Sequence, residues 1–583
     1  MISFELVEAA ERLGHVANEI NDAHCLGLDI ETTGLSPIHN RIRLVQINTC
    51  KGVYVIDLFK TKTLGPVVDA LRDSGAVKII HNAKFEQKWF LHKYGVELWP
   101  IFDTFRASAI IHNGKHLGHN LYDLYHRELK VAPEVDDQGH TDWSGPLTKE
   151  QLTYAAEDVT YLPKLREVLK PQLAKTGLNR IALLEFGACL PEAEIELNGF
   201  SVDQERWLKL AQENKSKLVE IRSMLDQMLP SPKGQLALPG VETGFNYNSP
   251  IQVKASFARL GIPLENTTEE TMAMVAARHP AIRKFMEYRK ISKRLSAFGP
   301  EWLRHIDSET GRIHTDFWPL TGAGRYSSRD PNLQQIPRSF EYRDCFRPPP
   351  GYIIIVCDYG QIELRIAAQI TRDRVLREIY MRGEDAHRRT ASIVSGVPID
   401  KVTKEQRQAA KPVNFGLIYG LGAERLVVYS LANYGVAITL RQAKEFRRRY
   451  FDGYSGIRAW HDLALRDGER TKMAKTLWGR RRFLDPEKHR NEFFNTPVQG
   501  TGADGLKRAL REVYMRLKPY GRENVRMVHM VHDEIVLEVK DDPHVIEAVK
   551  PEIQQGMVDG IQGMLPNVPV IAEADVGESW AAH

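Results

Sequence analysis

The sequence predicts an α/β protein that is divided into several domains. At 583 residues the chain is too long for a single hydrophobic core. Short apolar runs typical of strands recur along it, and longer stretches between them show helical spacing of apolar residues. The composition is 43% hydrophobic and 26% charged, which excludes disorder as the main state of the chain.

Charge and cysteine content narrow the class of protein further. The net charge is only +4, so binding of a polyanion has to rely on local basic patches, with candidates at 283–294, 447–449 and 480–482. Each patch by itself is more typical of a solvated surface. The five cysteines lack Cys-x-x-Cys spacing, which indicates a reducing compartment without structural zinc. Without a signal peptide or an apolar run of ~18–20 residues, we expect a cytoplasmic protein that does not span a membrane.

The N-terminal third shows strands followed by helices. Residues 26–31 alternate in character, which places Asp29 and Glu31 on the same side of a strand, about 7 Å apart. Further strands are expected at 43–48 and 53–56, and Tyr154 and Asp158 share one face of a later helix. An Asp-x-Glu pair alone is more often an exposed strand face, so both interpretations stay open at this point.

The first carboxylate of the C-terminal half is Asp358, which ends the apolar run 353–357. That run is typical of a strand buried on both faces. A carboxylate at its end is costly to bury unless it is paired or holds a cation. Strand-terminal aspartates are also common as turn or cap residues, so the structural alternative is not excluded.

The second carboxylate group is Asp533-Glu534, at the tip of a strand–turn–strand pattern over 525–539. Hairpin geometry does not require adjacent acids, and a divalent cation would offset their repulsion. If Asp358 and Asp533 come together, they can hold two hard cations ~3.5–4 Å apart, as in enzymes of phosphoryl transfer.

Between these acids, Arg407, Lys411, Phe415 and Tyr419 recur at steps of four, which keeps them on one helix face. Two cations followed by two aromatic rings suit a triphosphate, a sugar and a base. The alternative is a solvated basic face that runs into a core-facing aromatic pair. Pro412 lies within this stretch and should kink the helix or mark its first turn.

These three C-terminal segments resemble, in order and spacing, the polymerase motifs of family A DNA polymerases of the polymerase I or Klenow-fragment type. The acids and tyrosine of the N-terminal third resemble the motifs of DEDD proofreading 3′–5′ exonucleases. The resemblance implies a ribonuclease-H-like exonuclease domain followed by a right-hand polymerase. The implied boundaries are 1–185 for the exonuclease, 186–315 for the palm entry and thumb, 316–372 for the first part of the palm, 373–499 for the fingers and 500–583 for the second part of the palm.

The resemblance assigns roles to the polymerase residues. Asp358 and Asp533 would hold two Mg²⁺ ions, with Glu534 in support and Lys411 as a proton donor to pyrophosphate. Contacts to the incoming deoxynucleotide fall on Arg407, Lys411, Phe415, Tyr419, His387, Gln361 and Glu363, the last of which would block a ribose 2′-hydroxyl. Contacts to the primer terminus fall on Arg325, Asn495, Gln499 and His532, which would check the minor groove. Asn491 stands where the family often has arginine, so Arg490 is a candidate substitute.

The exonuclease roles follow in the same way. Asp29, Glu31, Glu86 and Asp158 would hold two further Mg²⁺ ions, with Mn²⁺ as the alternative metal in both sites. Tyr154 would orient the attacking water, and Leu35 would wedge against the terminal base. The family usually has aspartate at position 86, and the extra methylene moves the carboxylate by roughly 1.5 Å. We expect an active exonuclease with Glu86 as a ligand, direct or through water. The alternative is a surface helix residue and a weak or inactive exonuclease.

The overall interpretation is a template-directed DNA polymerase with proofreading, acting as a monomer on primer–template DNA and deoxynucleoside triphosphates. The N-terminal part lacks room for a 5′-nuclease domain, which favours a replicative enzyme of phage or organelle type, with the host cytoplasm as its location if it comes from a phage. Partners such as a helicase or single-strand-binding protein are not visible in the sequence. Two alternatives are a single-subunit RNA polymerase and a non-catalytic nucleic-acid-binding protein. Glu363 and the exonuclease residues argue against the first, and the retention of every acid argues against the second.

Overall fold

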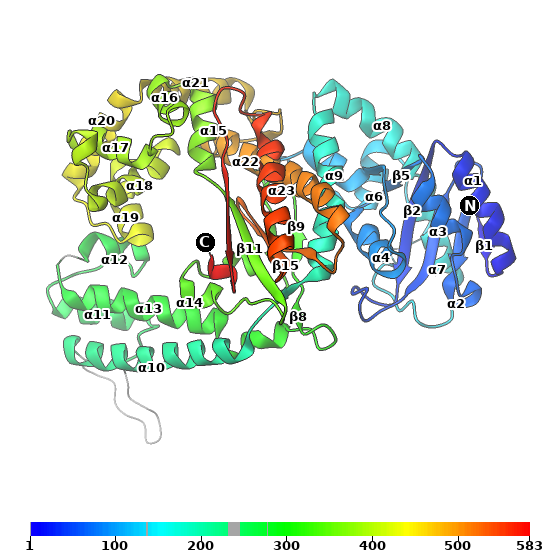
Figure 1. Cartoon of the computed structure of the whole chain (residues 1–583), viewed down its shortest axis with the longest axis horizontal. Coiled ribbons are helices and arrows are strands. Elements are labelled where there is room, and N and C mark those ends of the chain that lie inside the picture. The colour runs from blue at the N-terminus through cyan, green and yellow to red at the C-terminus, as the bar shows by residue number, and fades with distance from the viewer. Residues whose placement is uncertain (1, 136–137, 231–244, 277, 583) are drawn as a thin grey trace, which may run out of the picture.

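The computed structural model describes the chain except for residues 1, 136–137, 231–244, 277 and 583. Figure 1 shows an N-terminal lobe on one side of a central palm sheet, with two helical parts enclosing the opposite side. The mixed α/β organisation that the sequence predicts is confirmed. Among the described residues, no helix combines the length and apolar character needed to cross a bilayer.

The N-terminal lobe contains a six-stranded mixed sheet flanked by helices. The strand order is β1 (Glu5–Val7), β4 (Val53–Asp57), β3 (Ile42–Asn48), β2 (Cys25–Thr32), β5 (Val77–Ile80) and β6 (Ile101–Asp103). The helices are α1 (Leu13–Asp22), α2 (Leu58–Thr61), α3 (Pro66–Asp73), α4 (Lys84–Tyr94), α5 (Thr104–Ile111), α6 (Leu121–Leu124), α7 (Lys149–Thr160) and α8 (Leu162–Lys175). The three strands expected at its start are therefore present as β2, β3 and β4.

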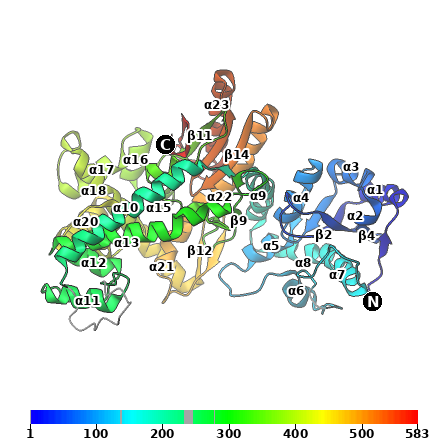
Figure 2. The same ribbon diagram turned by 90° about the horizontal axis from the view of Figure 1, so that it is seen from below.

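A long buried helix, α9 (Asn179–Asn198), joins this lobe to the rest of the molecule (Figure 2). Its first half packs in the lobe's core, through Ile181 and Phe186, and its second half reaches the palm core through Leu190 and Ile195. The expected domain boundary between residues 185 and 186 therefore falls inside one continuous helix.

The palm is a four-stranded antiparallel sheet in the order β14 (Val525–Val531), β15 (Glu534–Lys540), β11 (Tyr352–Tyr359) and β16 (Ala572–Gly577). Ile355 and Cys357 of β11 face one core, while Ile354 and Val356 face another, so both faces of the strand are buried. This explains the continuous apolar run in the sequence. The palm helices are α14 (Phe340–Arg343), α15 (Ile362–Thr371), α22 (Glu492–Leu517) and α23 (Pro543–Gln562), and α22 crosses the expected boundary at residue 499.

The helical parts enclose the open side of the palm. The thumb has its own hydrophobic core and consists of α10 (Gln204–Met228), α11 (Pro250–Arg259), α12 (Glu269–Val275) and α13 (Pro280–Phe298). The fingers consist of α16 (Arg374–Met381), α17 (Ala386–Ser395), α18 (Lys404–Ile418), α19 (Ala423–Tyr434), α20 (Leu440–Gly453) and α21 (Ser455–Thr471). The short strand pairs are β7 (Phe200–Ser201) with β8 (Arg312–Ile313), β9 (Asp316–Trp318) with β10 (Ser327–Arg329), and β12 (Met473–Lys475) with β13 (Arg481–Phe483).

Candidate active sites

The palm brings the two predicted carboxylate groups to the same edge of its sheet. Asp358 lies near the end of β11 and pairs in register with Glu534 at the start of β15. Asp533 occupies the tight turn between β14 and β15, where its carbonyl accepts a hydrogen bond from the backbone N–H of Tyr359 at 3.4 Å. His532 adopts a left-handed φ of 56° in this turn, which reverses the chain directly beside Asp358.

Electrostatics at this edge favour a cation. Burial raises the pKa of Asp533 to about 8, with further contributions from the negative charges of Asp358 and Glu363. Glu534 differs from the other two acids, because Arg343 Nη1 donates to one of its oxygens at 3.0 Å and Trp580 Nε1 donates to the other. Both of its oxygens thus accept hydrogen bonds from protein side chains, as suits the expected supporting role.

The fingers place the predicted phosphate contacts on α18 and α17. Arg407 Nε donates to Asp385 at 2.6 Å, which holds its guanidinium in place. The rings of His387 and Phe415 pack together with their centroids 5.7 Å apart. Burial lowers the pKa of His387 to about 4, so the imidazole is neutral at pH 7. Pro412 lies in the middle of α18, so the expectation that it could mark the helix's first turn is wrong.

A carboxylate bridge connects three residues that the sequence assigned to different tasks. One oxygen of Glu363 accepts a hydrogen bond from Arg325 Nη2, and the other accepts one from the Tyr419 hydroxyl. The side chain of Gln499, on α22, also hydrogen-bonds Tyr419. The residues proposed to contact the sugar, the base and the primer terminus therefore form one hydrogen-bonded network.

Two further predicted contacts flank this network. Gln361 adopts a left-handed φ of 56° immediately before α15, and its side-chain oxygen accepts a hydrogen bond from the Tyr380 hydroxyl at 3.2 Å. Asn495 lies on α22 one turn before Gln499, and its Oδ1 is buried without a hydrogen-bond donor in the described part of the chain. An acceptor of this kind is expected to find its donor in a ligand or in water.

The second acid cluster lies in the N-terminal lobe, more than a hundred residues from the palm carboxylates along the chain. Asp29, Glu31 and Asp158 each offer an oxygen within 4.8 Å of the others, which is suitable for holding a metal ion. Glu86 reaches the same cluster from α4, where it hydrogen-bonds Asp29 and is only 2% exposed. The alternative interpretation of Glu86 as a surface residue is therefore wrong.

Burial and mutual repulsion also dominate the electrostatics of this cluster. Burial raises the pKa of Asp29 to about 6, and burial together with the charge of Asp29 raises the pKa of Glu86 well above its usual value. Tyr154 packs between Tyr122 and Trp143, with ring centroids 6.2 Å and 6.3 Å away. Burial and the nearby carboxylates raise its pKa, so its hydroxyl keeps its proton.

Leu35 follows β2 and is 82% exposed, which leaves it free to contact a substrate. Sequence reasoning missed several supporting residues. Arg343 and Trp580 hold Glu534, and the positive charge of Arg338 lies close enough to Asp533 to lower its pKa in part. In the sequence, Arg338 and Arg343 follow the turn-rich segment 321–337, and Trp580 lies close to the last residue. Neither position is specific for a functional residue.

Comparisons with known proteins agree with this geometry. The family model "DNA polymerase family A" matches residues 218–582, and the model "3′-5′ exonuclease" matches residues 4–174. DNA polymerase I of Aquifex aeolicus is 32% identical over 99% of this chain and 100% of its own length. The thermostable DNA polymerase I of Thermus aquaticus is 35% identical over 58% of this chain and 42% of its own length.

A further relative, DNA polymerase I of Chloroflexus aurantiacus, is 30% identical over 99% of this chain, which spans 63% of that protein. Among solved structures, the POL domain of Pol1 from M. smegmatis, in complex with DNA primer-template and dNTP, matches with a TM-score of 0.81 and 25% identity. That match covers 100% of this chain and 99% of the solved one. The chain therefore belongs to DNA polymerase family A and is a DNA-directed DNA polymerase that carries a 3′–5′ exonuclease domain.

Proposed function

We propose that the chain extends DNA primers by two-metal nucleotidyl transfer and that each candidate site residue acts as its position suggests. The observation that carries this proposal is the convergence of Asp358 and Asp533 from separate segments at one edge of the palm sheet. Carboxylate oxygens are the ligands that Mg²⁺ prefers, and burial together with the negative charges of Asp358 and Glu363 raises the pKa of Asp533. When bound there, Mg²⁺ would lower the pKa of the primer 3′-hydroxyl and neutralise the triphosphate.

The fingers residues bind and orient the nucleotide in this proposal. Arg407 and Lys411, one helical turn apart on α18, present two positive charges to the triphosphate. The neutral ring of His387 donates one hydrogen bond to the same group. Lys411 carries no ion pair within the described part of the chain, so its ammonium is available to donate a proton to departing pyrophosphate.

Selection of the nucleotide depends on the Glu363 bridge. Its two hydrogen bonds, from Arg325 and Tyr419, hold the carboxylate side chain in one position. A side chain fixed on both oxygens cannot move aside easily, and we infer that it excludes a ribose 2′-hydroxyl by steric overlap. Phe415 and Tyr419 pack on the sugar and base, and Arg325, Asn495, Gln499 and His532 check the pair at the primer terminus.

The exonuclease uses the second acid cluster. Asp29, Glu31 and Asp158 would hold its two metal ions together with Glu86, which hydrogen-bonds Asp29, and these ions would supply charge for attack on the terminal phosphodiester. Tyr154 keeps its hydroxyl proton and donates a hydrogen bond that orients the attacking water. Leu35, which is exposed and follows Glu31 by four residues in the chain, separates the terminal base from its neighbour.

Single substitutions in each cluster test the two-site proposal. Asp533→Ala should abolish primer extension in Mg²⁺ and leave digestion of a single-stranded oligonucleotide largely intact. The matched variant Asp158→Ala should do the reverse. If either well-folded variant loses both activities, the two sites are not independent. A comparison of ribonucleotides with deoxynucleotides in the same assay measures the sugar preference. A replicative role of phage or organelle type stays a prediction, and the relatives described above are bacterial.

A further inference from the structure

Gln46 is a buried glutamine of the N-terminal lobe whose side-chain amide takes no part in holding the fold together. It lies on β3, an inner strand of the six-stranded sheet, and its exposed fraction is 0%. Within the described part of the chain, neither its Oε1 nor its Nε2 has a hydrogen-bond partner. An amide buried in this way destabilises a fold, so its presence in the core calls for a reason other than stability.

The register of the sheet places Gln46 directly beside the exonuclease acids. On one side it pairs with Asp29 of β2, and on the other side with Val55 of β4. Residues directly opposite each other in antiparallel strands project from the same face, with Cβ atoms about 4.5–5.5 Å apart. Gln46 therefore lies on the face of the sheet that carries Asp29 and Glu31.

Helix α7 covers this face and closes it off from solvent. Asn48, two residues further along β3 on the same face, donates from Nδ2 to the carbonyls of residues 159 and 160 at 3.1 Å and 3.0 Å, at the end of α7. A Cβ at Gly27, opposite Asn48 on β2, would meet the carbonyl of residue 159 at 2.8 Å. The side chain of Gln46 is therefore enclosed between the sheet and the helix.

The neighbours of Gln46 in the sheet leave one acceptor for its amide. Leu44 and Val55 are apolar. Asn48 uses both parts of its own amide, because its Nδ2 donates to α7 and its Oδ1 accepts a backbone N–H at 2.8 Å. Of these four nearest neighbours on the same face, Asp29 is the remaining one, and its carboxylate is an acceptor.

We propose that Gln46 is a positioning residue of the exonuclease, whose Nε2 donates a hydrogen bond to Asp29 when that carboxylate holds a metal ion. This inference rests on the proposed function of the acid cluster. Asp29 hydrogen-bonds Glu86, and a cation bound by both acids would take the place of that contact. A ligating carboxylate is in turn oriented by a donor outside the ligand set. An amide supplies that donor without adding a positive charge that would repel the cation.

Gln46→Met tests the proposal, because methionine has nearly the same length and lacks the amide. Every arm uses the full chain with Asp358→Ala/Asp533→Ala, so that binding of Mn²⁺ reports on the N-terminal cluster. Isothermal titration calorimetry should show about tenfold weaker Mn²⁺ binding in Gln46→Met. Digestion of a single-stranded oligonucleotide should need a correspondingly higher Mg²⁺ concentration. The melting temperature without added metal should stay equal or rise, because a buried amide without a partner has been removed.

Gln87→Met is the matched control, since Gln87 is a second buried glutamine of the same lobe, on α4. Its amide is fully used, because Nε2 donates to the Val96 carbonyl at 3.1 Å and Oε1 accepts from the Leu98 N–H at 2.8 Å. This variant should lower the melting temperature and leave the Mn²⁺ affinity unchanged. Gln46→Leu repeats the measurement with a shorter apolar side chain, in case methionine does not pack at this position.

The Mn²⁺ affinity of the folded variants decides the outcome. An unchanged affinity in Gln46→Met or Gln46→Leu would overturn the proposal and assign the glutamine to the core alone. An equal loss of affinity in Gln87→Met would also overturn it, because the weakening would then follow general destabilisation. The proposed function has a separate test, since Asp158→Ala in the same background should remove the calorimetric signal. Mn²⁺ binding that survives Asp158→Ala would reject the acid cluster as the metal site, whatever Gln46 does.

Discussion

Replacement of Lys84 by methionine should lower both the stability of the fold and the rate of the exonuclease. Lys84 begins α4 in the N-terminal lobe, two residues before Glu86, and is buried at 6% exposure. Its ammonium group donates to Glu196 at 2.6 Å, to Asp316 at 2.5 Å and to the carbonyl of Phe317 at 2.6 Å. All of these acceptors belong to α9 or to the polymerase half.

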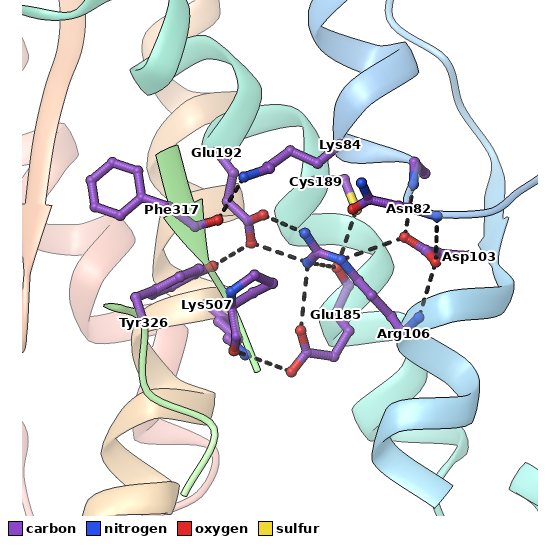
Figure 3. A network of polar contacts seen from close by, with 12 residues as sticks. Asn82, Lys84, Asp103, Arg106, Glu185, Cys189, Glu192, Phe317, Tyr326 and Lys507 are labelled. Atoms are coloured by element: carbon purple, nitrogen blue, oxygen red, sulfur yellow. Dashed lines mark hydrogen bonds and ion pairs between the residues drawn. The ribbon is translucent and has the colours of Figure 1, made fainter. Parts of the chain in front are cut away.

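The same interface contains a second set of buried polar contacts. Figure 3 shows Arg106 of the N-terminal lobe reaching Glu185 and Glu192 on α9. Glu185 in turn accepts from Lys507 at 2.6 Å, and Glu192 accepts from the Tyr326 hydroxyl at 2.5 Å. These contacts connect α4, through Lys84, and α5, through Arg106, to α9 and the polymerase half. The position of Glu86 on α4 therefore depends on the polymerase half.

The expected magnitude follows from the charges that Lys84→Met would leave behind. Removal of one partner of a buried ion pair costs about 3–5 kcal/mol when the other is left uncompensated. Here Lys88 still pairs with Glu196 at 3.0 Å and Arg329 still pairs with Asp316 at 2.6 Å. We therefore expect Lys84→Met to lower the free energy of unfolding by about 3 kcal/mol, at the lower end of this range.

Thermal denaturation and exonuclease rates measure the two effects. The melting temperature of Lys84→Met should fall, and the charge-balanced double variant Lys84→Met/Glu196→Gln should recover part of the loss. The exonuclease rate should fall by about 10–100-fold in both variants, with a higher Mg²⁺ requirement, as for other residues that orient metal ligands. Lys88→Met, one turn along the same helix, should have a smaller effect. An unchanged Mg²⁺ dependence in folded Lys84→Met would refute the reasoning.

Three further predictions follow from individual side chains. Glu363→Ala should lower discrimination against ribonucleotides by about a hundredfold or more, and unchanged discrimination in single-turnover incorporation would remove it from sugar selection. Glu86→Ala should abolish single-strand digestion while Glu86→Asp retains it; wild-type rates in the alanine variant would exclude Glu86 as a ligand. The carboxylates of Asp307 and Glu309 raise the pKa of His39, so this contact stabilises the fold at low pH and the gain is lost as pH rises through the raised pKa. His39→Ala should therefore lower the melting temperature at about pH 6 but not at about pH 9, and an equal effect at both would contradict the assignment.

The sequence by itself determined several of the strands and helices and the acidic residues that lie together in each candidate site. The run 353–357 forms a strand buried on both faces, and Asp358 and Asp533 lie at the same edge of the sheet. The repeat at steps of four in 407–419 formed one helix. Such features are local, because periodicity and turn residues reflect which side of each element faces a core.

Only the tertiary structure decided how these elements act on one another. The Glu363 bridge joins Arg325 and Tyr419, which lie 38 and 56 residues from it along the chain. The contact of Lys84 with Asp316 spans 232 residues. The extra methylene of Glu86 is accommodated inside the lobe, where its partner is Asp29. Sequence patterns do not encode such pairs, because they arise when separately formed surfaces pack and each buried polar group must find a partner there.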